Sequence, residues 1–414
     1  MKRGAFLFGV LAAASVGATP TVTVDSVTQD AVTRMVTVNY TLGGEAAAVT
    51  ADMQVNGISV ATAHTAGEIN RKLAPGSHAF TWAPANDGDV KAAAEGLVAV
   101  VKAWSDDNPP PYLAVELLPP RAISYYASAD AIPGGVRSEE CRTTRLVLRR
   151  IPAKDVVWTM GAPRGEAGQT SANAENQHNV KFTSDYYLGV YPVTQKQYVL
   201  IRGITKGEDE PFNFKSSVQH PQRGLYPAEG IRYVDLRGPT ETYNWPATAR
   251  GVVASDGFLG VLRTDTGLDF DLPTDAEWEY ACRAGTAEAL SSGKAYTEAN
   301  LSELGWFKST ENPPDSPQPV GLKEPNAWGL YDMHGNVYEW CLDWYKEKLA
   351  PAVEPEENPV GPLQADSTGN RVLRGGSYTA TGDRARSAYR YNYNAPEKAS
   401  VQTGFRLWCP AVVK

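Results

Sequence analysis

The residues of this 414-residue chain that could carry out chemistry are few and far apart. Its four cysteines match neither the spacing of a zinc site nor that of a redox pair. No two of its five histidines stand at ligand spacing for a site of two histidines and one carboxylate, and His334 is expected to face the solvent from a turn. An HExxH helix, a nucleophile elbow and a phosphate-binding loop are missing from the sequence. These residues give little support to thiol, metal or serine catalysis.

Oxygen ligands gather in the segment DMHGNVYEW, residues 332–340. Asp332 and Glu339 provide two carboxylates, and Gly335 permits a sharp turn between them. Calcium binds about six to eight oxygens, drawn from carboxylates and from backbone carbonyls on tightly turned segments. The pattern is therefore typical of a calcium site. The alternative is a metal-free turn, with Glu339 in a salt bridge and Trp340 in the core.

A second candidate site is the segment TATGDRARSAYRYNYN, residues 379–394, which we name the recognition loop. Tyrosine, threonine, asparagine and aspartate on a loop held by a rigid scaffold are typical of binding surfaces, because tyrosine offers a large contact area at low entropic cost. The candidate ligand-binding residues are Thr379, Thr381, Asp383, Arg384, Tyr389, Tyr391, Asn392, Tyr393 and Asn394. Arg386, Ser387, Ala388 and Arg390 are interpreted as the frame. For each tyrosine, packing against a neighbouring loop is the alternative.

Charge and hydropathy exclude two kinds of partner. The net charge is -8, the pI is about 5.3, and no basic stripe is present, so nucleic acid is not an expected partner. No apolar run reaches the roughly 20 residues that a membrane-spanning helix needs.

The first 18 residues have the pattern of a signal peptide. Lys2 and Arg3 precede an apolar core at residues 5–14, and small residues up to Ala18 form a cleavage site. A membrane anchor is the alternative, but the apolar core is short for one. We therefore expect a secreted or periplasmic protein. In such a compartment four cysteines indicate two disulfides, with three possible pairings.

Two modules are expected to position the candidate sites. Residues 19–106 alternate apolar and polar residues between glycine- and proline-rich turns, which predicts a small all-β sandwich of the immunoglobulin or fibronectin type. Residues 107–140 begin with a run of prolines and are predicted to be a stiff linker and lead-in. Residues 141–414 form the second module.

Few regular elements are evident in the second module. Thr194 and Gly203 predict the two ends of one helix. Thr274 and Glu277 predict a capping box at the start of another. The segment LRGGS predicts a strand whose two glycines allow close approach of a ligand or of another backbone, and plain packing of the scaffold is the alternative.

Five segments of the second module together resemble a known family. They are DYYLGVYPVTQKQY (185–198), DLPTDAEWEYACRAGT (271–286), NAWGLYDMHGNVYEWCLDWY (326–345), RVLRGGSY (371–378) and GFRL (404–407). In this order they resemble the formylglycine-generating enzyme family, also called sulfatase-modifying factor domains, over residues 141–410. The resemblance implies an α+β fold that is irregular and C-type-lectin-like, with calcium supporting the scaffold.

The resemblance also places the family's active site in the recognition loop. Active members oxidise a cysteine in a CxPxR segment to formylglycine, and they bind copper through two cysteines that follow the RGGS element. Those positions are Ala380 and Ala385 in this chain. A methyl group has no lone pair, whereas a thiolate is the soft ligand that selects Cu(I), so copper is not an expected cofactor. Ser377 and Tyr338, the latter where the family commonly has tryptophan, match positions that line the family's pocket.

The family pattern implies a structural calcium ion. The matching ligand positions are Asp332, Gly335, Val337 and Glu339, with Gly335 and Val337 acting through their backbone carbonyls.

The resemblance further implies a disulfide pattern. A lectin-like domain brings its first and last strands side by side, which suggests a Cys141–Cys409 bridge and leaves Cys282 to pair with Cys341. Buried thiols at Cys282 and Cys341 are the alternative.

The leading hypothesis is an exported two-domain protein whose family frame is kept while the chemistry is lost. It would bind a protein, peptide or glycan through the recognition loop. The alternative is a formylglycine-generating-type oxidoreductase, or another protein-modifying enzyme, with an unrecognised active site. A bound redox metal would favour the enzyme.

Overall fold

The computed structural model describes most of the chain. The described residues are 19–60, 62, 64–87, 96–171, 174–203, 223–240, 242–247, 250, 252–311, 313–347, 354–392 and 395–414. The predicted signal peptide, residues 1–18, lies outside them, as do Tyr393 and Asn394 of the recognition loop. Within these ranges, no helix combines the length and the apolar character that crossing a membrane requires.

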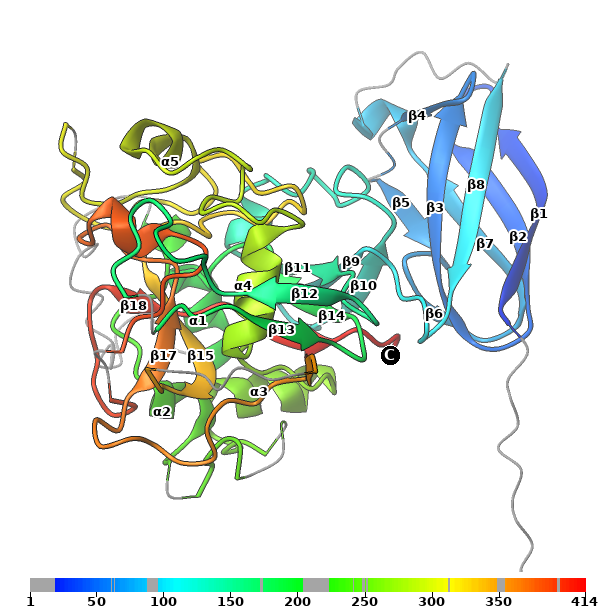
Figure 1. The fold of residues 1–414 in the computed structure, drawn as a ribbon. Coiled ribbons are helices and arrows are strands. Elements are labelled where there is room, and N and C mark those ends of the chain that lie inside the picture. Colours follow the sequence, from blue (N-terminus) through cyan, green and yellow to red (C-terminus); the bar gives the residue numbers. More distant parts are fainter. Residues whose placement is uncertain are drawn as a thin grey trace, which may run out of the picture.

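The first module consists of two facing sheets (Figure 1). One sheet has the order β1 (Thr21–Gln29), β2 (Val36–Gly43), β7 (Gly76–Trp82) and β5 (Thr65–Gly67). The other contains β4 (Ile58–Val60), β3 (Ala47–Val55) and β6 (Arg71–Leu73), with β8 (Leu97–Trp104) also paired to β3. Alternate residues of β2, including Val36, Val38 and Tyr40, are buried in a core shared with β3, β7 and β8. The module is therefore a β-sandwich with one core between its sheets.

The largest sheet of the second module has five strands. Their order is β10 (Ile123–Tyr126), β9 (Tyr112–Glu116), β11 (Arg145–Ile151), β14 (Tyr186–Gly189) and β19 (Trp408–Pro410). β9 and β10 come from the segment that the sequence predicted to be linker and lead-in, so part of that segment belongs to the second module. The implied adjacency of the first and last strands is wrong, because β14 lies between β11 and β19.

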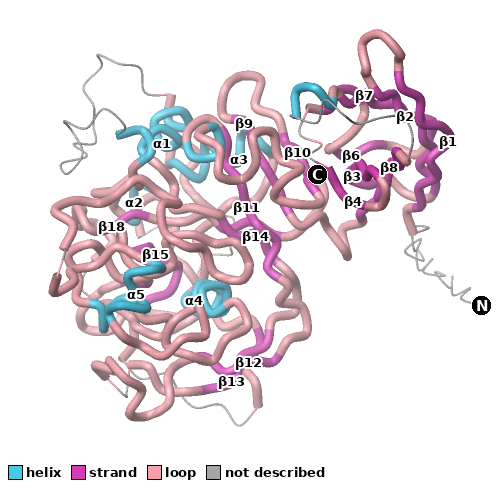
Figure 2. Tube along the Cα trace, turned by 90° about the horizontal axis from the view of Figure 1, so that it is seen from above, coloured by secondary structure: helices cyan, strands magenta, loops and turns pink. Residues whose placement is uncertain are grey.

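The rest of the second module consists of short elements joined by long loops (Figure 2). One small sheet contains β12 (Val157–Met160), β13 (His178–Lys181) and β16 (Glu356–Glu357), and another contains β17 (Arg371–Arg374), β15 (Tyr338–Trp344) and β18 (Thr403–Gly404). The helices are α1 (Gln195–Arg202), α2 (Tyr233–Arg237), α3 (Phe258–Thr266), α4 (Asp275–Arg283) and α5 (Glu298–Leu304). Single 3-10 turns lie at Pro84–Asp87, Glu140–Arg142, Arg223–Leu225 and Gly382–Ala385. The fold is α+β, as predicted, with few helices and much loop.

Both predicted helix starts are confirmed. Thr194 caps α1 in a capping box with Gln197, and Gly203 ends the helix in the left-handed conformation at φ 65°. At α4 the Glu277 backbone N–H donates to Thr274 Oγ1 (3.2 Å), while the Thr274 N–H donates to Glu277 Oε2 (2.7 Å).

Buried arginines hold the loops of the second module together. Arg237, Arg371, Arg374, Arg386 and Arg406 are all fully buried. Arg406 shows how they act: it donates to the backbone carbonyls of Gly189 (2.7 Å), Val190 (3.0 Å) and Tyr331 (2.7 Å), and it pairs with Glu339. Loop carbonyls have no sheet partner and must find a donor when buried, and a guanidinium supplies up to five N–H groups.

Candidate functional site

The turn after β17 is made possible by its two glycines. Gly375 and Gly376 have φ values of 90° and 79°, which non-glycine residues rarely adopt. A Cβ at Gly376 would lie 2.9 Å from the Cα of Ala385. Gly376 therefore lets the backbone of the Gly382–Ala385 turn approach, which is the close approach of another backbone that the sequence predicted, whereas Gly375 packs against the Trp278 side chain.

The two family cysteine positions are occupied by buried methyl groups. Ala380 is 6% exposed and Ala385 is fully buried. The Ala380 N–H donates to the Ser377 carbonyl (3.0 Å), and the Ala385 carbonyl accepts from His334 Nδ1 (2.6 Å). The backbone of the frame is thus fixed on both sides of the missing thiols.

Ser377 is buried among neutral groups. Its Oγ lies 3.2 Å from Thr379 Oγ1 and 3.4 Å from Gln402 Oε1. Neither a hydroxyl nor an amide can take the proton of an attacking hydroxyl, so these contacts do not activate Ser377 as a nucleophile.

Tyr338 belongs to a stack of three tyrosine rings. Its ring centroid lies 4.4 Å from that of Tyr391 with an interplanar angle of 10°, and Tyr391 lies 6.4 Å from Tyr389. Burial raises the pKa of Tyr338 well above its usual value and that of Tyr389 to about 12. All this keeps the phenols of Tyr338 and Tyr389 protonated near neutral pH. Tyr391 of the recognition loop therefore packs on Tyr338, the residue that the sequence resemblance places in the family's pocket.

The recognition loop divides into exposed and packed residues. Thr379, Thr381 and Arg384 are exposed, and Asp383, Tyr391 and Asn392 are partly exposed. Tyr389 is only 9% exposed, so its main role is packing, which was the alternative for each tyrosine.

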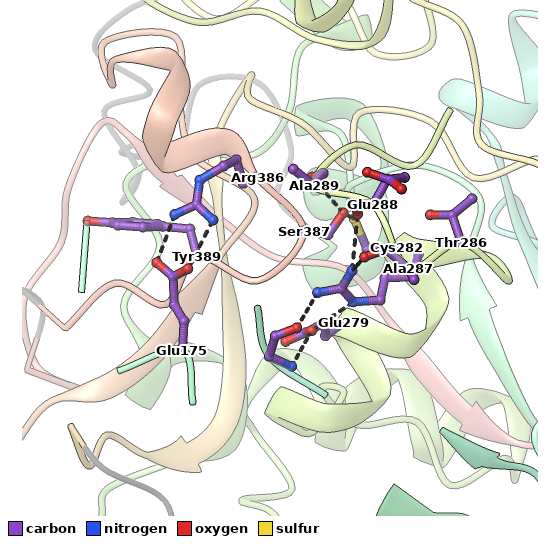
Figure 3. Close-up of polar contacts among 12 residues, drawn as sticks. Glu175, Glu279, Cys282, Thr286, Ala287, Glu288, Ala289, Arg386, Ser387 and Tyr389 are labelled. Carbon is purple, nitrogen blue, oxygen red and sulfur yellow. Dashed lines mark hydrogen bonds and ion pairs between the residues drawn. The ribbon is translucent and has the colours of Figure 1, made fainter. Parts of the chain in front are cut away.

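The residues interpreted as frame are buried and anchored. Arg386 pairs with Glu175 through two contacts of 2.8 and 2.9 Å, beside Tyr389 (Figure 3), and with Glu166 at 2.7 Å. Arg390 Nε donates to Asp275 Oδ2 at 2.7 Å. Charge-assisted bonds of this kind are among the strongest hydrogen bonds in proteins, so they hold the exposed residues of the loop in place.

The predicted disulfides are not present. Cys141, Cys282, Cys341 and Cys409 are all free and buried. Cys141 lies in the turn before β11 and Cys409 lies in β19, and they belong to different core clusters. Because β14 separates β11 from β19, the two cysteines do not pair. Cys282 and Cys341 are buried thiols, the alternative that the sequence left open.

A buried cysteine and histidine lie directly behind the recognition loop. Cys282 Sγ is 3.6 Å from Ser387 Oγ and 3.9 Å from His334 Nε2. Ser387 Oγ donates to the Ala289 carbonyl at 3.1 Å, as Figure 3 shows. The sequence predicted that His334 faces the solvent, and this is wrong, because His334 is 1% exposed.

The Cys282–His334 contact has the residue types of a catalytic dyad but not the charge state. Burial raises the pKa of Cys282 to about 12 and lowers that of His334 to about 4. His334 Nδ1 faces a carbonyl and so carries the proton, which leaves Nε2 to accept from the Ser291 N–H at 3.1 Å. A neutral thiol that is also out of contact with solvent is a poor nucleophile.

The two carboxylates predicted to bind calcium differ in the partners that they already have. Asp332 is buried, and its donors in the described part of the chain are neutral: the Gly321 N–H (2.7 Å) and Asn336 Nδ2 (3.2 Å). Glu339 is held by Arg406 (2.8 and 3.0 Å) and by Trp278 Nε1 (2.6 Å). The Asp332 carboxylate therefore fits a cation, whereas the Glu339 salt bridge matches the metal-free alternative.

Histidine, cysteine and acidic side chains do not by themselves make a metal site. Across the described ranges, no three of them gather closely enough to hold an ion. A calcium ion at Asp332 would need backbone carbonyls for most of its ligands.

Comparison with known proteins adds a family and several relatives. A family model described as the sulfatase-modifying factor enzyme 1-like domain matches residues 148–410. The chaperone protein LppX of Paenibacillus barcinonensis is 28% identical over 255 residues, which cover 56% of this chain and 82% of LppX. The formylglycine-generating enzyme of Streptomyces coelicolor is 37% identical over 146 residues, 33% of this chain and 45% of the enzyme.

Other similarities are more limited in extent. The serine/threonine-protein kinase Pkn1 of Chlamydia trachomatis is 29% identical over 280 residues, which cover 66% of this chain but only 40% of the kinase. Among solved structures, Treponema denticola variable protein 1 has 24% identity and a TM-score of 0.49, covering 64% of this chain and 96% of its own. PvdO from Pseudomonas aeruginosa has 24% identity and a TM-score of 0.47, with 64% and 94% covered.

Proposed function

The chain belongs to the sulfatase-modifying factor enzyme 1-like family, and from this premise we propose that its second module is a non-catalytic domain that binds a protein or peptide through the recognition loop. The observation that carries the proposal is the pair Ala380 and Ala385, two buried methyl groups at the positions of the family's copper-binding thiols. Neither can be oxidised or bind a metal.

The remaining thiols do not replace the missing pair. All four cysteines are buried, and burial raises the pKa of Cys282 to about 12. A thiolate is the form that binds copper or attacks a substrate, and burial works against it here. This argues against the alternative, an oxidoreductase with an unrecognised site.

The recognition loop combines exposed side chains with buried anchors, which supports a binding role for the loop. Thr379, Thr381 and Arg384 are exposed, while Arg386 and Arg390 are buried and paired with carboxylates. A relative named as a chaperone protein favours a protein or peptide over a glycan as the ligand. The signal-peptide pattern of residues 1–18 supports a secreted or periplasmic location as part of the same proposal.

The test of lost chemistry is mass spectrometry of a CxPxR peptide incubated with the protein, copper and oxygen. The Streptomyces coelicolor relative serves as the positive control. We expect no loss of the cysteine thiol in the peptide. Conversion to formylglycine would overturn the proposal and establish the oxidoreductase alternative.

The test of binding is selection of peptides from a displayed library against the immobilised protein. Replacing Arg384 and Tyr391 together by alanine is expected to weaken a selected peptide about tenfold or more, because aromatic and arginine side chains dominate binding energy. Lys154→Ala, an exposed residue outside the recognition loop, is the matched control. Equal loss in the control, or no loss in the double variant, would remove the loop from the proposal.

A structural calcium ion at Asp332, Gly335, Val337 and Glu339 is a further part of the proposal. The support is the buried Asp332 carboxylate, whose donors among the residues that the structure describes are neutral. Calcium would fix the turn before β15 by drawing the carboxylate and the carbonyls of Gly335 and Val337 to one point.

Thermal unfolding with calcium or with a chelator tests the ion. Free calcium at a hundred times its Kd should stabilise the fold by about 2.7 kcal/mol. Asp332→Asn is expected to abolish this gain, while Asp366→Asn, an exposed carboxylate elsewhere, should retain it. An unchanged melting temperature in the wild type would argue for the metal-free turn.

A further inference from the structure

A small cavity in the second module lies apart from the exposed side of the recognition loop. Its volume is about 170 Å³. Its lining residues come from β12, β13, α4, β15, β16 and nearby loops: Met160, His178, Asp275, Ala276, Asp343, Lys346, Glu356, Pro359, Gly361, Pro362 and Arg390. Four of the polar members, His178, Asp275, Asp343 and Arg390, are more than nine-tenths buried, so buried polar groups form part of its wall.

Asp343 is a buried carboxyl group in this wall, and it has no ion pair among the described residues. It is 3% exposed, and its Oδ2 accepts from the backbone N–H of Asp275 at 2.8 Å. The ion pairs found among the described residues do not include Asp343. Gly361 also lines the cavity, and a Cβ there would lie 2.6 Å from Asp343 Oδ1, so the missing side chain leaves room beside this oxygen.

The nearest cation is already used by other groups. Arg390 Nε donates to Asp275 Oδ2 (2.7 Å), and its Nη1 donates to the carbonyls of Lys346 (2.8 Å) and Ala174 (3.2 Å). Asp275 in turn also pairs with Arg374. Arg390 is therefore occupied by Asp275 and by two carbonyls, and none of the ion pairs in the described part of the chain reaches Asp343.

His178 adds a second acceptor to the cavity wall. Its Nδ1 lies 3.1 Å from the Asn176 carbonyl, which can only accept, so Nδ1 carries the proton in the neutral ring. Nε2 then holds a lone pair. The exposed side of the cavity is lined by Lys346 and Glu356, which carry opposite charges.

Two buried atoms of the cavity wall, Asp343 Oδ1 and His178 Nε2, are therefore acceptors, and a matching ligand must supply hydrogen-bond donors. A metal ion is disfavoured, because His, Cys, Asp and Glu do not gather in threes anywhere in the described ranges. A compact ammonium group provides both positive charge and N–H donors, and its strongest hydrogen bonds are to a carboxylate. We propose that this cavity is a binding site for the primary ammonium group of a small amine, with Asp343 as its anionic partner and His178 as a neutral acceptor.

The experiment uses ethylammonium chloride as the probe, with residues 19–414 of the protein at about pH 8, where Asp343, whose pKa is raised to about 7, is ionised. Saturation-transfer NMR follows the methyl signal of the probe at constant ionic strength, with sodium chloride as the balancing salt. Saturable binding is expected. Tetramethylammonium, which has the charge but no N–H group, should not compete for the site.

Variants localise the binding. Asp343→Asn keeps an acceptor for the Asp275 N–H and should weaken the probe about tenfold or more, since a charged hydrogen bond is lost. Glu357→Gln, an exposed neighbour of Glu356 that does not line the cavity, should bind as the wild type does.

Three results would overturn the proposal. They are the absence of saturable binding to the wild type, equal binding by Asp343→Asn, and full competition by tetramethylammonium. The first and third use only the wild type, so they decide the matter even where the variant does not fold. The peptide-binding test of the recognition loop stands independently of all three.

Discussion

Single atoms decide the chemistry of this site. Ala380 and Ala385, which the sequence resemblance matches to the family's cysteines, present buried methyl groups, while the surrounding turn contains Gly375, Gly376 and Ser377. The sulfur that remains nearby, on Cys282, is sealed in the core behind the loop. A frame kept without these thiols is consistent with the binding role proposed above.

Thiol accessibility follows directly from this arrangement. All four cysteines are free and buried, so a thiol reagent such as Ellman's reagent should find no reactive thiol in the native protein. In denaturant without reductant it should find four. Two thiols or none in denaturant would show that disulfides form after all.

Asp343 should make stability depend on pH. Burial, with the nearby charge of Asp275, raises its pKa to about 7, and Arg390 and Glu277 also act on it. The folded state then holds this proton more tightly than the unfolded chain. The resulting stability is complete below the unfolded pKa of about 4 and is lost as pH rises to about 7.

Comparison with Asp343→Asn isolates this titration. The variant does not titrate at this position. Between about pH 4 and pH 7 the unfolding free energy of the wild type should therefore fall relative to that of the variant, by at most about 1.4 kcal/mol per pH unit. Chemical denaturation at several pH values measures the difference. Parallel curves for the two proteins would mean that Asp343 is ionised throughout.

At the scale of elements, short helices depend on their ends. α4 is nine residues long, and its first turn is held by the reciprocal bonds of Thr274 and Glu277. Thr274→Ala should cost about 1 kcal/mol of unfolding free energy, and Thr274→Ser should restore most of it. Thr297 caps α5 without a return bond from a glutamate, so Thr297→Ala should cost less in the same denaturation assay.

Features that depend on local sequence could be predicted, and those that depend on distant contacts could not. The caps at Thr194 and Thr274 follow from neighbouring residues, and both are confirmed. The strand predicted at LRGGS is confirmed only for Leu373 and Arg374, because both glycines belong to the turn that follows. The burial of His334 depends on Ala385 and Ser291, each more than forty positions away. The cavity at Asp343 is likewise assembled from four strands, one helix and the loops beside them, and no short motif encodes it.

At the scale of the whole molecule, the two modules are in contact. Alternate residues Ala47 and Val49 of β3 point into the sandwich core, whereas Ala48 is fully buried in the core of the second module. The Tyr125 N–H donates to the Asn70 carbonyl (2.8 Å), and Lys72 Nζ donates to the Val413 carbonyl (2.9 Å). In Figure 1 the sandwich lies beside the β10 edge of the large sheet.

Ala48→Glu should separate the modules without unfolding the sandwich, because the side chain at this position points out of the sandwich core. We expect a single thermal transition to become two, since each module then unfolds alone. Gln54→Glu, a partly exposed position further along β3, is the control and should leave one transition. Unchanged unfolding of Ala48→Glu would mean that the modules are already independent.

The anchoring of the recognition loop by Arg386 and Arg390 has a consequence for protein engineering. Both guanidiniums bind carboxylates from other segments, Glu175 and Asp275, and neither depends on the exposed side chains of the loop. Thr379, Thr381 and Arg384 can therefore be randomised while the anchors stay in place. The domain offers a framework for a combinatorial library, in which new specificities are selected by changing three exposed positions on a loop anchored by buried ion pairs.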